Sequence, residues 1–250
     1  MSVIIWHDEL DSTNMEAHRR MADLDNMSVI AARWQSAGRG QRGNTWSSDK
    51  GENLTFSIVL KYGDGSLPAI PAASQHSVSM AASLALVDFL ADFGISAGIK
   101  WPNDIYVSDR KICGMLIEHT LCGSSSLKNS IIGIGLNLNQ HIFDPSIPNP
   151  TSMSLETGCS YDCESMLEEF VQCFAKALPK LGCMPQLEAA FLENLWRKDE
   201  LHTYVDCRDI NTEVPFKGII RGITPLFRLI VENEKGELVQ FSFKELRYII

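Results

Sequence analysis

The sequence predicts an α+β protein: a two-layer α/β part with a mixed, largely antiparallel sheet, followed by a small all-β unit. Alternating apolar segments joined by short turns favour antiparallel pairing in the larger part. Helical spacing of apolar residues between about 74 and 93 predicts a long helix against that sheet. After about residue 200 only short alternating segments remain, broken by turns at barrel-like spacing. We therefore expect a large domain over 1–200 and a small β domain over 201–250.

The expected elements follow from these patterns in chain order. In the larger part, strands are expected at 3–7, 28–34, 54–62, 95–100, 104–107, 111–120 and 130–138. Helices are expected at 12–22, 74–93, 163–181 and 185–198; the second carries Val78, Ala81, Ala85 and Phe89 at helical spacing. The β unit is expected to contain strands at 214–220, 226–232, 238–243 and 246–250.

Composition narrows the class of protein. The 250 residues carry 22 Lys and Arg against 31 Asp and Glu, so the net charge is −9, which argues against broad nonspecific binding of nucleic acid. No apolar run reaches the ~20 residues of a membrane span, and the N-terminus lacks the basic flank of a signal peptide. The seven cysteines have no zinc-site spacing, and we expect them to be reduced in a cytoplasmic protein.

The most informative motif is the run from Lys100 to Asp104, followed by Lys111 and Gly114. Pro102 cannot lie inside a central strand because it lacks a ladder N–H, so it marks a turn, and Asn103, Asp104 and Lys111 are placed near a hairpin. Strands hold such side chains rigidly, and electrostatic catalysis requires charged groups that are already in place. The motif therefore predicts a cationic centre beside a developing negative charge.

A second motif is the glycine–arginine loop, which runs from Gly38 through Arg39, Gly40 and Arg42 to Trp46. Glycines let the backbone approach a ligand and form an anion nest, and arginines add forked donors for phosphate or carboxylate. The alternative is a flexible surface loop with solvated arginines. The spacing fits neither a Walker loop nor a dinucleotide fingerprint.

Two further segments have both a functional and a structural interpretation. Thr13 with Glu16 fits a helix capping box, whereas a functional hydroxyl in the same segment would point at a polar ligand. Gly133 and Gly135 within an apolar strand indicate close approach of a ligand to the backbone, or a bulge. Asn137 carries an amide that suits a purine edge, or it lies in a turn.

These blocks, in this order and spacing, resemble those of biotin protein ligases. The matching set comprises Asp11-Ser12-Thr13-Asn14, Gln35 with the segment 38–46, the block 100–104, Lys111 with Gly114, and the segment 133–139. The resemblance covers most of the chain and implies that the C-terminal β unit is an SH3-like barrel. It implies a ligase that forms biotinyl-5′-AMP from biotin and ATP, then transfers biotin to one lysine of a carboxyl carrier protein.

The resemblance also implies roles for individual residues. Biotin binding is expected from Ser12, Thr13, Asn14, Gln35, Gly38, Arg39, Gly40, Lys111 and Gly114. ATP or adenylate binding is expected from Arg39, Arg42, Trp46, Lys111 and Asn137. The catalytic set is expected to be Lys111, Asp104, Asn103 and Arg39. Magnesium is expected to arrive with ATP, without a fixed protein site.

Alternative functions stay open at this point. A lipoate or octanoate ligase or transferase of the same fold is the alternative enzyme, and a non-catalytic binding module or a scaffold is the alternative outside enzymes. Because the first strand begins at Val3, we expect no winged DNA-binding domain and no repressor function. Expected partners are a biotin carboxyl carrier protein, neither DNA nor membrane, and at most a weak second copy of the chain.

One departure from the family pattern generates a prediction. Many members carry arginine directly after the Gly-Arg-Gly segment, where this chain has Gln41. We predict that Gln41→Arg slows the release of biotinyl-5′-AMP, because it restores a forked cation beside the adenylate. A single-turnover release assay measures this, and a release rate equal to that of the natural chain would contradict it.

Overall fold

The computed structural model describes all residues except 1–2, 64 and 210–212. The side chain of Arg42 is also not described. Its larger sheet has seven strands in the order β1-β2-β3-β7-β6-β5-β4. Their bounds are β1 Ile4–His7, β2 Val29–Ala32, β3 Leu54–Lys61, β4 Gly98–Lys100, β5 Asp104–Val107, β6 Arg110–Cys122 and β7 Ser126–Leu136. β1 and β2 pair in parallel, and the other neighbours pair antiparallel. The predicted mixed, largely antiparallel sheet is thus confirmed.

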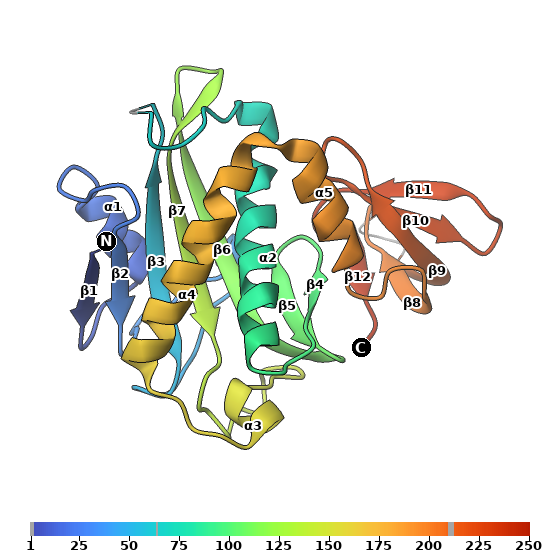
Figure 1. Cartoon of the computed structure of the whole chain (residues 1–250). Coiled ribbons are helices and arrows are strands. Elements are labelled where there is room, and N and C mark those ends of the chain that lie inside the picture. Colours follow the sequence, from blue (N-terminus) through green and yellow to red (C-terminus); the bar gives the residue numbers. More distant parts are fainter. Residues whose placement is uncertain (1–2, 64, 210–212) are drawn as a thin grey trace.

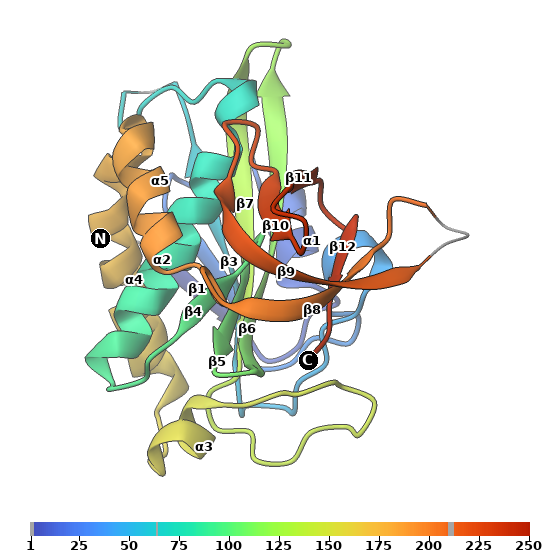
Figure 2. The same cartoon turned by 90° about the vertical axis from the view of Figure 1, so that its right-hand side faces the viewer.

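Helices lie on both faces of this sheet. The helices α2 (His76–Asp92), α4 (Cys163–Ala177) and α5 (Met184–Glu193) cover one face (Figure 1). The short helix α1 (Thr13–Arg19) lies on the opposite face, which is seen edge-on in Figure 2. The remaining helical turns are α3 (Met153–Thr157), η1 (Gln41–Gly43), η2 (Ala72–Ser74) and η3 (Leu178–Gly182). Within the described residues, no helix is both long and apolar enough to cross a membrane.

The alternation of side chains along the central strands separates a core face from a second face. Phe56 packs on Phe170 of α4 with ring centroids 5.4 Å apart, and Phe89 of α2 meets the same ring at 5.6 Å. Burial of each such side chain stabilises the fold by about 1.5–3 kcal/mol. On the other face, Ser57 pairs with Gly133, and Gly135 lies opposite both Thr55 and Gly114. Small residues therefore leave open space over the middle of that second face.

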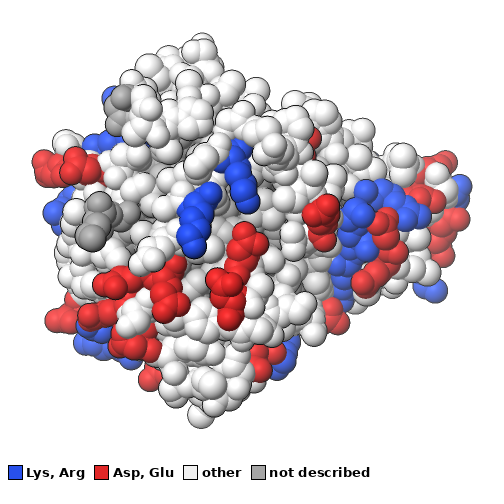
Figure 3. Space-filling view, in the orientation of Figure 1, with Lys and Arg blue, Asp and Glu red and all other residues white. Residues whose placement is uncertain are grey.

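The C-terminal strands form a separate five-stranded antiparallel sheet in the order β11-β10-β9-β8-β12. Their bounds are β8 Leu201–Asp206, β9 Val214–Ile223, β10 Leu229–Asn233, β11 Leu238–Phe241 and β12 Leu246–Tyr248. In Figure 3, charges of both signs gather over this sheet, consistent with the ion pairs that Arg221 makes with Asp199 and Glu232. The expected division into domains at residue 200 stays a prediction.

Aromatic side chains fasten this second sheet to the first. The indole N–H of Trp101 donates to the carbonyl oxygen of Phe227 at 3.1 Å, and the Trp101 ring lies 6.2 Å from the rings of Phe227 and Phe243. Phe227 stacks in turn on His76 at the start of α2, at 5.1 Å. The C-terminal sheet is therefore held directly against the segment that contains the Lys100–Asp104 motif.

Several element boundaries differ from the sequence predictions. The first helix ends at Arg19 rather than near residue 22, and the helix expected to reach residue 181 changes to 3-10 geometry at Leu178. Strand β8 and helix α3 were not predicted. The ladder of β8 depends on its neighbours β9 and β12, which the local pattern of residues 201–206 does not reveal.

Candidate active site

A cavity of about 1150 Å³ lies on the sheet face opposite α2 and α4, and the C-terminal sheet forms part of its wall. It brings together most of the predicted site residues, namely Ser12, Thr13, Asn14, Gln35, Arg39, Gly40, Trp46, Asn103, Asp104, Lys111, Gly114 and Asn137. Gly38 lies behind the wall, where it is buried against the backbone of Trp46. The side chain of Arg42 is outside the described part of the structure.

The cationic centre is Lys111, at the start of β6. Its ammonium lies 2.8 Å from Asp104 Oδ1, and both side chains are about 30% exposed, at 31% and 29%. A bulge shifts the β5–β6 register here, so that Lys111 pairs with Tyr106 while Cys113 pairs with Ile105. The Lys111 backbone also donates to the carbonyl oxygen of Asn149. These contacts fix the ammonium beside a carboxylate at the mouth of the cavity.

Trp46 forms a lid over glycine positions in the sheet. Its ring centroid is 6.0 Å from the Lys111 ammonium. A Cβ at Gly135 would lie 2.2 Å from Trp46 Cε2, and one at Gly114 would lie 3.1 Å from both the Lys111 Nζ and the Trp46 ring. Glycine at these two positions is therefore what allows the indole to lie directly on the strands.

The end of the cavity beside α1 has a polar floor built from buried side chains. Gln35 Oε1 accepts from the Thr13 N–H at 2.8 Å and from the Thr13 hydroxyl at 3.2 Å. Ser57 Oγ lies 2.8 Å from Thr13 Oγ1 and donates to Asn14 Oδ1 at 2.6 Å. Asn14 fits because Gly133 beneath it has no side chain; a Cβ there would lie 2.1 Å from Asn14 Oδ1.

The capping-box interpretation of Thr13 with Glu16 is wrong. Ser12, rather than Thr13, is the N-cap of α1, and its side chain makes no capping hydrogen bond. The Thr13 hydroxyl bonds instead to Gln35 and Ser57, because these partners from distant parts of the chain offer a largely buried network.

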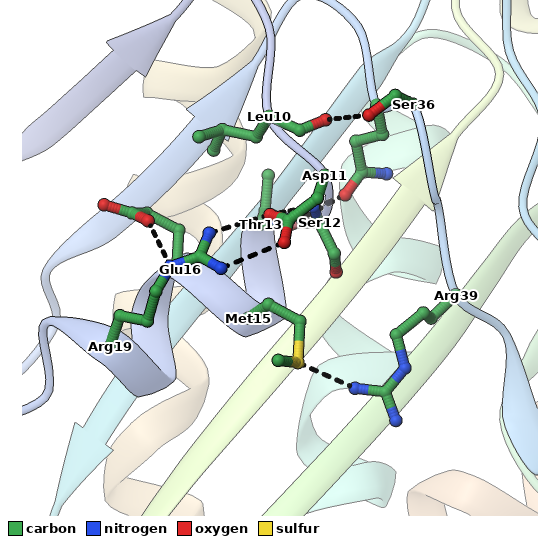
Figure 4. Close-up of polar contacts among 10 residues, drawn as sticks. Leu10, Asp11, Ser12, Thr13, Met15, Glu16, Arg19, Ser36 and Arg39 are labelled. Carbon is green, nitrogen blue, oxygen red and sulfur yellow. Dashed lines mark hydrogen bonds and ion pairs between the residues drawn. The ribbon is translucent and has the colours of Figure 1, made fainter.

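A charged cluster on the outer side holds the start of α1 in place (Figure 4). The Arg19 guanidinium forks between Asp11, at 2.7 and 2.9 Å, and Glu16, at 2.8 Å. Asp11 Oδ1 also accepts from the Ser12 N–H at 2.7 Å. The hydrogen bonds from Arg19 and from the Ser12 backbone lower the pKa of Asp11 to about 2. The cluster orients the turn that presents Ser12 and Thr13 to the cavity.

The glycine–arginine loop is an ordered hairpin in this structure. The Gly40 N–H donates to the Asn44 carbonyl at 2.7 Å, and the Trp46 N–H donates to the Gly38 carbonyl at 3.0 Å. Arg39 projects from the loop toward Met15, whose sulfur lies 3.3 Å from Arg39 Nη1 (Figure 4). The loop thus has internal backbone pairing.

Asn103 and Asn137 are both buried, and each side-chain amide donates to backbone. Asn103 Nδ2 donates to the Met115 carbonyl at 3.0 Å, and Asn137 Nδ2 donates to the Thr151 carbonyl at 2.9 Å. Each residue therefore fixes a turn beside Lys111. The expected contact between Asn137 and a nucleotide stays a prediction.

Lys100 belongs to the motif but was not predicted as a site residue. Its ammonium donates to the Tyr106 hydroxyl at 3.0 Å and lies 4.6 Å and 4.9 Å from the ring centroids of Tyr106 and Tyr248. Burial lowers the pKa of Lys100 to about 8, partly offset by Asp104 across the β4–β5 hairpin. The predicted hairpin could have identified Lys100 as a site residue, because it places residues 100 and 104 opposite each other.

Comparison with known proteins identifies the family. Residues 6–137 match the biotin/lipoate A/B protein ligase family. The chain is 35% identical over 244 residues to the biotin–[acetyl-CoA-carboxylase] ligase of Paracoccus denitrificans, covering 92% of this chain and 94% of that protein. It is 31% identical over 243 residues to the bifunctional ligase/repressor BirA of Bacillus subtilis, covering 93% of this chain and 70% of that protein.

The fold agrees with this relationship. The biotin protein ligase from Aquifex aeolicus, solved in complex with biotin and ATP, superposes over 100% of both chains with a TM-score of 0.77 at 22% identity. The fold is that of a protein ligase. The chain belongs to the biotin/lipoate A/B protein ligase family, and the resemblance to biotin protein ligases seen in the motifs is confirmed.

The close packing of Trp46 generates one prediction. Gly135→Ala places a methyl group against the indole, so the ring must leave the strand, and we expect the free energy of unfolding to fall by about 1–3 kcal/mol. Denaturant unfolding and Trp46 fluorescence measure the effect. Gly182→Ala is the matched control, because a Cβ there meets only Pro68, at 3.6 Å. Equal stability of the two variants would refute the packing argument.

A second prediction concerns Lys100. Because its pKa is about 8 in the folded state and 10.5 ordinarily, the unfolded state binds more protons between those values, so this lysine makes stability rise with pH across that window. We expect Asp104→Asn to lower the pKa of Lys100 further, since Asp104 favours the charged form. Titration of the Lys100 Cε resonance by ¹³C NMR measures both values, and Lys100→Met assigns the signal. An unshifted midpoint near 10.5 would be inconsistent with this site.

Proposed function

We propose that this chain is an ATP-dependent biotin protein ligase, which forms biotinyl-5′-AMP and then transfers biotin to a lysine of a biotin carboxyl carrier protein. The observation that carries the proposal is the position of Lys111. Its ammonium lies beside Asp104, under Trp46 and next to Gly114, in a cavity that also holds the Arg39 loop and a polar floor. The Paracoccus denitrificans relative is a biotin–[acetyl-CoA-carboxylase] ligase, and the Aquifex aeolicus biotin protein ligase was solved with biotin and ATP.

The first half-reaction brings two anions together. A biotin carboxylate oxygen attacks the α-phosphorus of ATP. The bond between the α-phosphorus and the oxygen that bridges the α- and β-phosphates breaks, and pyrophosphate leaves. Lys111 and Arg39 offset the repulsion between carboxylate and triphosphate and stabilise the charge that develops on the α-phosphate. Trp46 provides an aromatic face for the adenine, and the ordered hairpin that carries it shields the mixed anhydride from water.

In the second half-reaction, the amine of the carrier lysine attacks the acyl carbon of biotinyl-5′-AMP. An amide bond forms and AMP leaves with the electron pair of the broken acyl–oxygen bond. Asp104, at the mouth of the cavity and about 30% exposed, orients the incoming ammonium and accepts its proton. Asn103 positions Asp104 through the hydrogen bond between its amide and the Met115 carbonyl.

The polar floor favours biotin over a purely apolar acyl chain. Ser12, Thr13 and Gln35 line this end of the cavity, and Asn14 completes it. A ureido ring has both N–H donors and a carbonyl acceptor, so it can form hydrogen bonds with the hydroxyl and amide groups of the floor, and an octanoyl chain cannot.

Magnesium enters as part of the substrate, bound to ATP. Among the described residues there is no cluster of three or more His, Cys, Asp or Glu side chains with metal-binding geometry. Mg²⁺ commonly binds through substrate phosphates and only one or two carboxylates, and Asp104 is a suitable single carboxylate in the cavity. The ion would supply additional charge neutralisation on the triphosphate.

The test is a direct assay of the product. We expect a biotin carboxyl carrier domain incubated with the chain, ATP, magnesium and biotin to gain the mass of one biotin, and not to gain a lipoyl group when lipoate replaces biotin. Mass spectrometry of the carrier and calorimetric titration of both acids measure this. Lipoylation in place of biotinylation would favour the alternative enzyme, and no modification of the carrier would refute the ligase.

A substitution at Lys111 tests the role of this cation in the first half-reaction. Lys111→Ala removes the cation at the reacting centre, so we expect adenylate formation to fall at least 10²-fold while biotin binding to the polar floor persists. Pyrophosphate release and biotin calorimetry separate these two readouts. Near-normal adenylate formation by the variant would show that another group supplies the essential cation.

A further inference from the structure

Glu118 lies on β6, on the same sheet face as the cavity but outside its lining. One of its oxygens, Oε2, accepts from Asn14 Nδ2 at 2.8 Å and lies 3.4 Å from His18 Nε2. The other, Oε1, lies 3.5 Å from Arg39 Nη1. A single carboxylate therefore contacts both the polar floor and the glycine–arginine loop.

The two contacts differ in rigidity. Asn14 is 3% exposed. Its side chain accepts a hydrogen bond from Ser57 and packs directly on the backbone of Gly133. The Arg39 side chain is 46% exposed and projects from a surface hairpin. Because Asn14 fixes one oxygen of Glu118, the second oxygen presents a negative charge at a constant position, to which the loop arginine is drawn.

Arg39 lines the cavity while its guanidinium pairs with Glu118. Met15 supports the guanidinium from the α1 side, with its sulfur at 3.3 Å. Without the carboxylate, an exposed arginine would sample many solvated rotamers, and its availability to a ligand phosphate would fall.

We propose that Glu118 is a positioning residue, which holds Arg39 at the cavity wall and thereby keeps the loop over residues 38–46 closed on the adenylate. This inference rests on the proposed function, since the adenylate is its ligand. Glu118 does not touch the reacting atoms; it acts through Arg39. The same side chain links loop closure to the floor, because displacement of Asn14 would also displace the carboxylate.

Two substitutions separate the roles of Glu118. Glu118→Gln keeps an oxygen acceptor for Asn14 but removes the charge that holds Arg39, whereas Glu118→Ala removes both. Pairs of this exposure are worth ~0.2–1 kcal/mol, so we expect Glu118→Gln to release biotinyl-5′-AMP roughly 1.4- to fivefold faster, with biotin affinity unchanged. We expect Glu118→Ala to show the faster release and also weaker biotin binding, because the Asn14 amide loses the shorter of its two hydrogen bonds and keeps only the one to the Leu116 carbonyl, at 3.2 Å.

The measurements are single-turnover release of the adenylate and calorimetric binding of biotin. Glu232→Gln is the matched control, since it breaks an arginine pair with Arg221 in the C-terminal sheet. The effect of Glu118→Gln should persist in a His18→Gln background and vanish in an Arg39→Gln background. Unchanged or slower release by Glu118→Gln, or an equal effect with Arg39 removed, would overturn the inference. If the natural chain forms no adenylate at all, the proposed function fails instead.

Discussion

The absence of side chains at Gly133 and Gly135, on one face of β7, is the constraint on which the site depends. Gly133 admits the Asn14 amide and Gly135 admits the Trp46 ring, in each case at distances that a Cβ would make impossible, 2.1 and 2.2 Å. Gly114 lies opposite Gly135 on β6 and admits the Lys111 ammonium. Floor, lid and cation therefore all lie directly on backbone, which is the most rigid surface a sheet offers.

The other face of the same strands explains that rigidity. Phe56 and Ile134 belong to the apolar core beneath α2 and α4, while Gly133 and Gly135, on either side of Ile134, line the cavity. A register slip of one residue would exchange the two sets of side chains and destroy both core and site. The packing energy that fixes the register, about 1.5–3 kcal/mol for each large buried side chain, therefore also fixes the geometry of the cavity.

Local chemistry determined what the sequence alone could predict. Pro102 excluded a central strand and so placed Asp104 near a hairpin, which the structure confirms with Lys100 and Asp104 paired across it. The sequence alone could not predict contacts between segments that are far apart along the chain. The capping prediction at Thr13 failed because Gln35 competes for its hydroxyl, and Lys100 was missed because its burial depends on Tyr248 at the far end of the chain.

Two cations of the cavity are each held by a carboxylate, Lys111 by Asp104 and Arg39 by Glu118. An isolated cation in a partly buried cleft would be costly to desolvate, whereas a paired one keeps its position at little net cost. A triphosphate carries more charge than the Asp104 carboxylate and offers several acceptor oxygens, so it competes for Lys111 without requiring the ammonium to move far. Asp104 thus serves as an exchangeable partner of Lys111, whereas Glu118 keeps its hold on Arg39. Both carboxylates preorganise the cleft for an anion, and Asp104 becomes available once the phosphates have engaged Lys111.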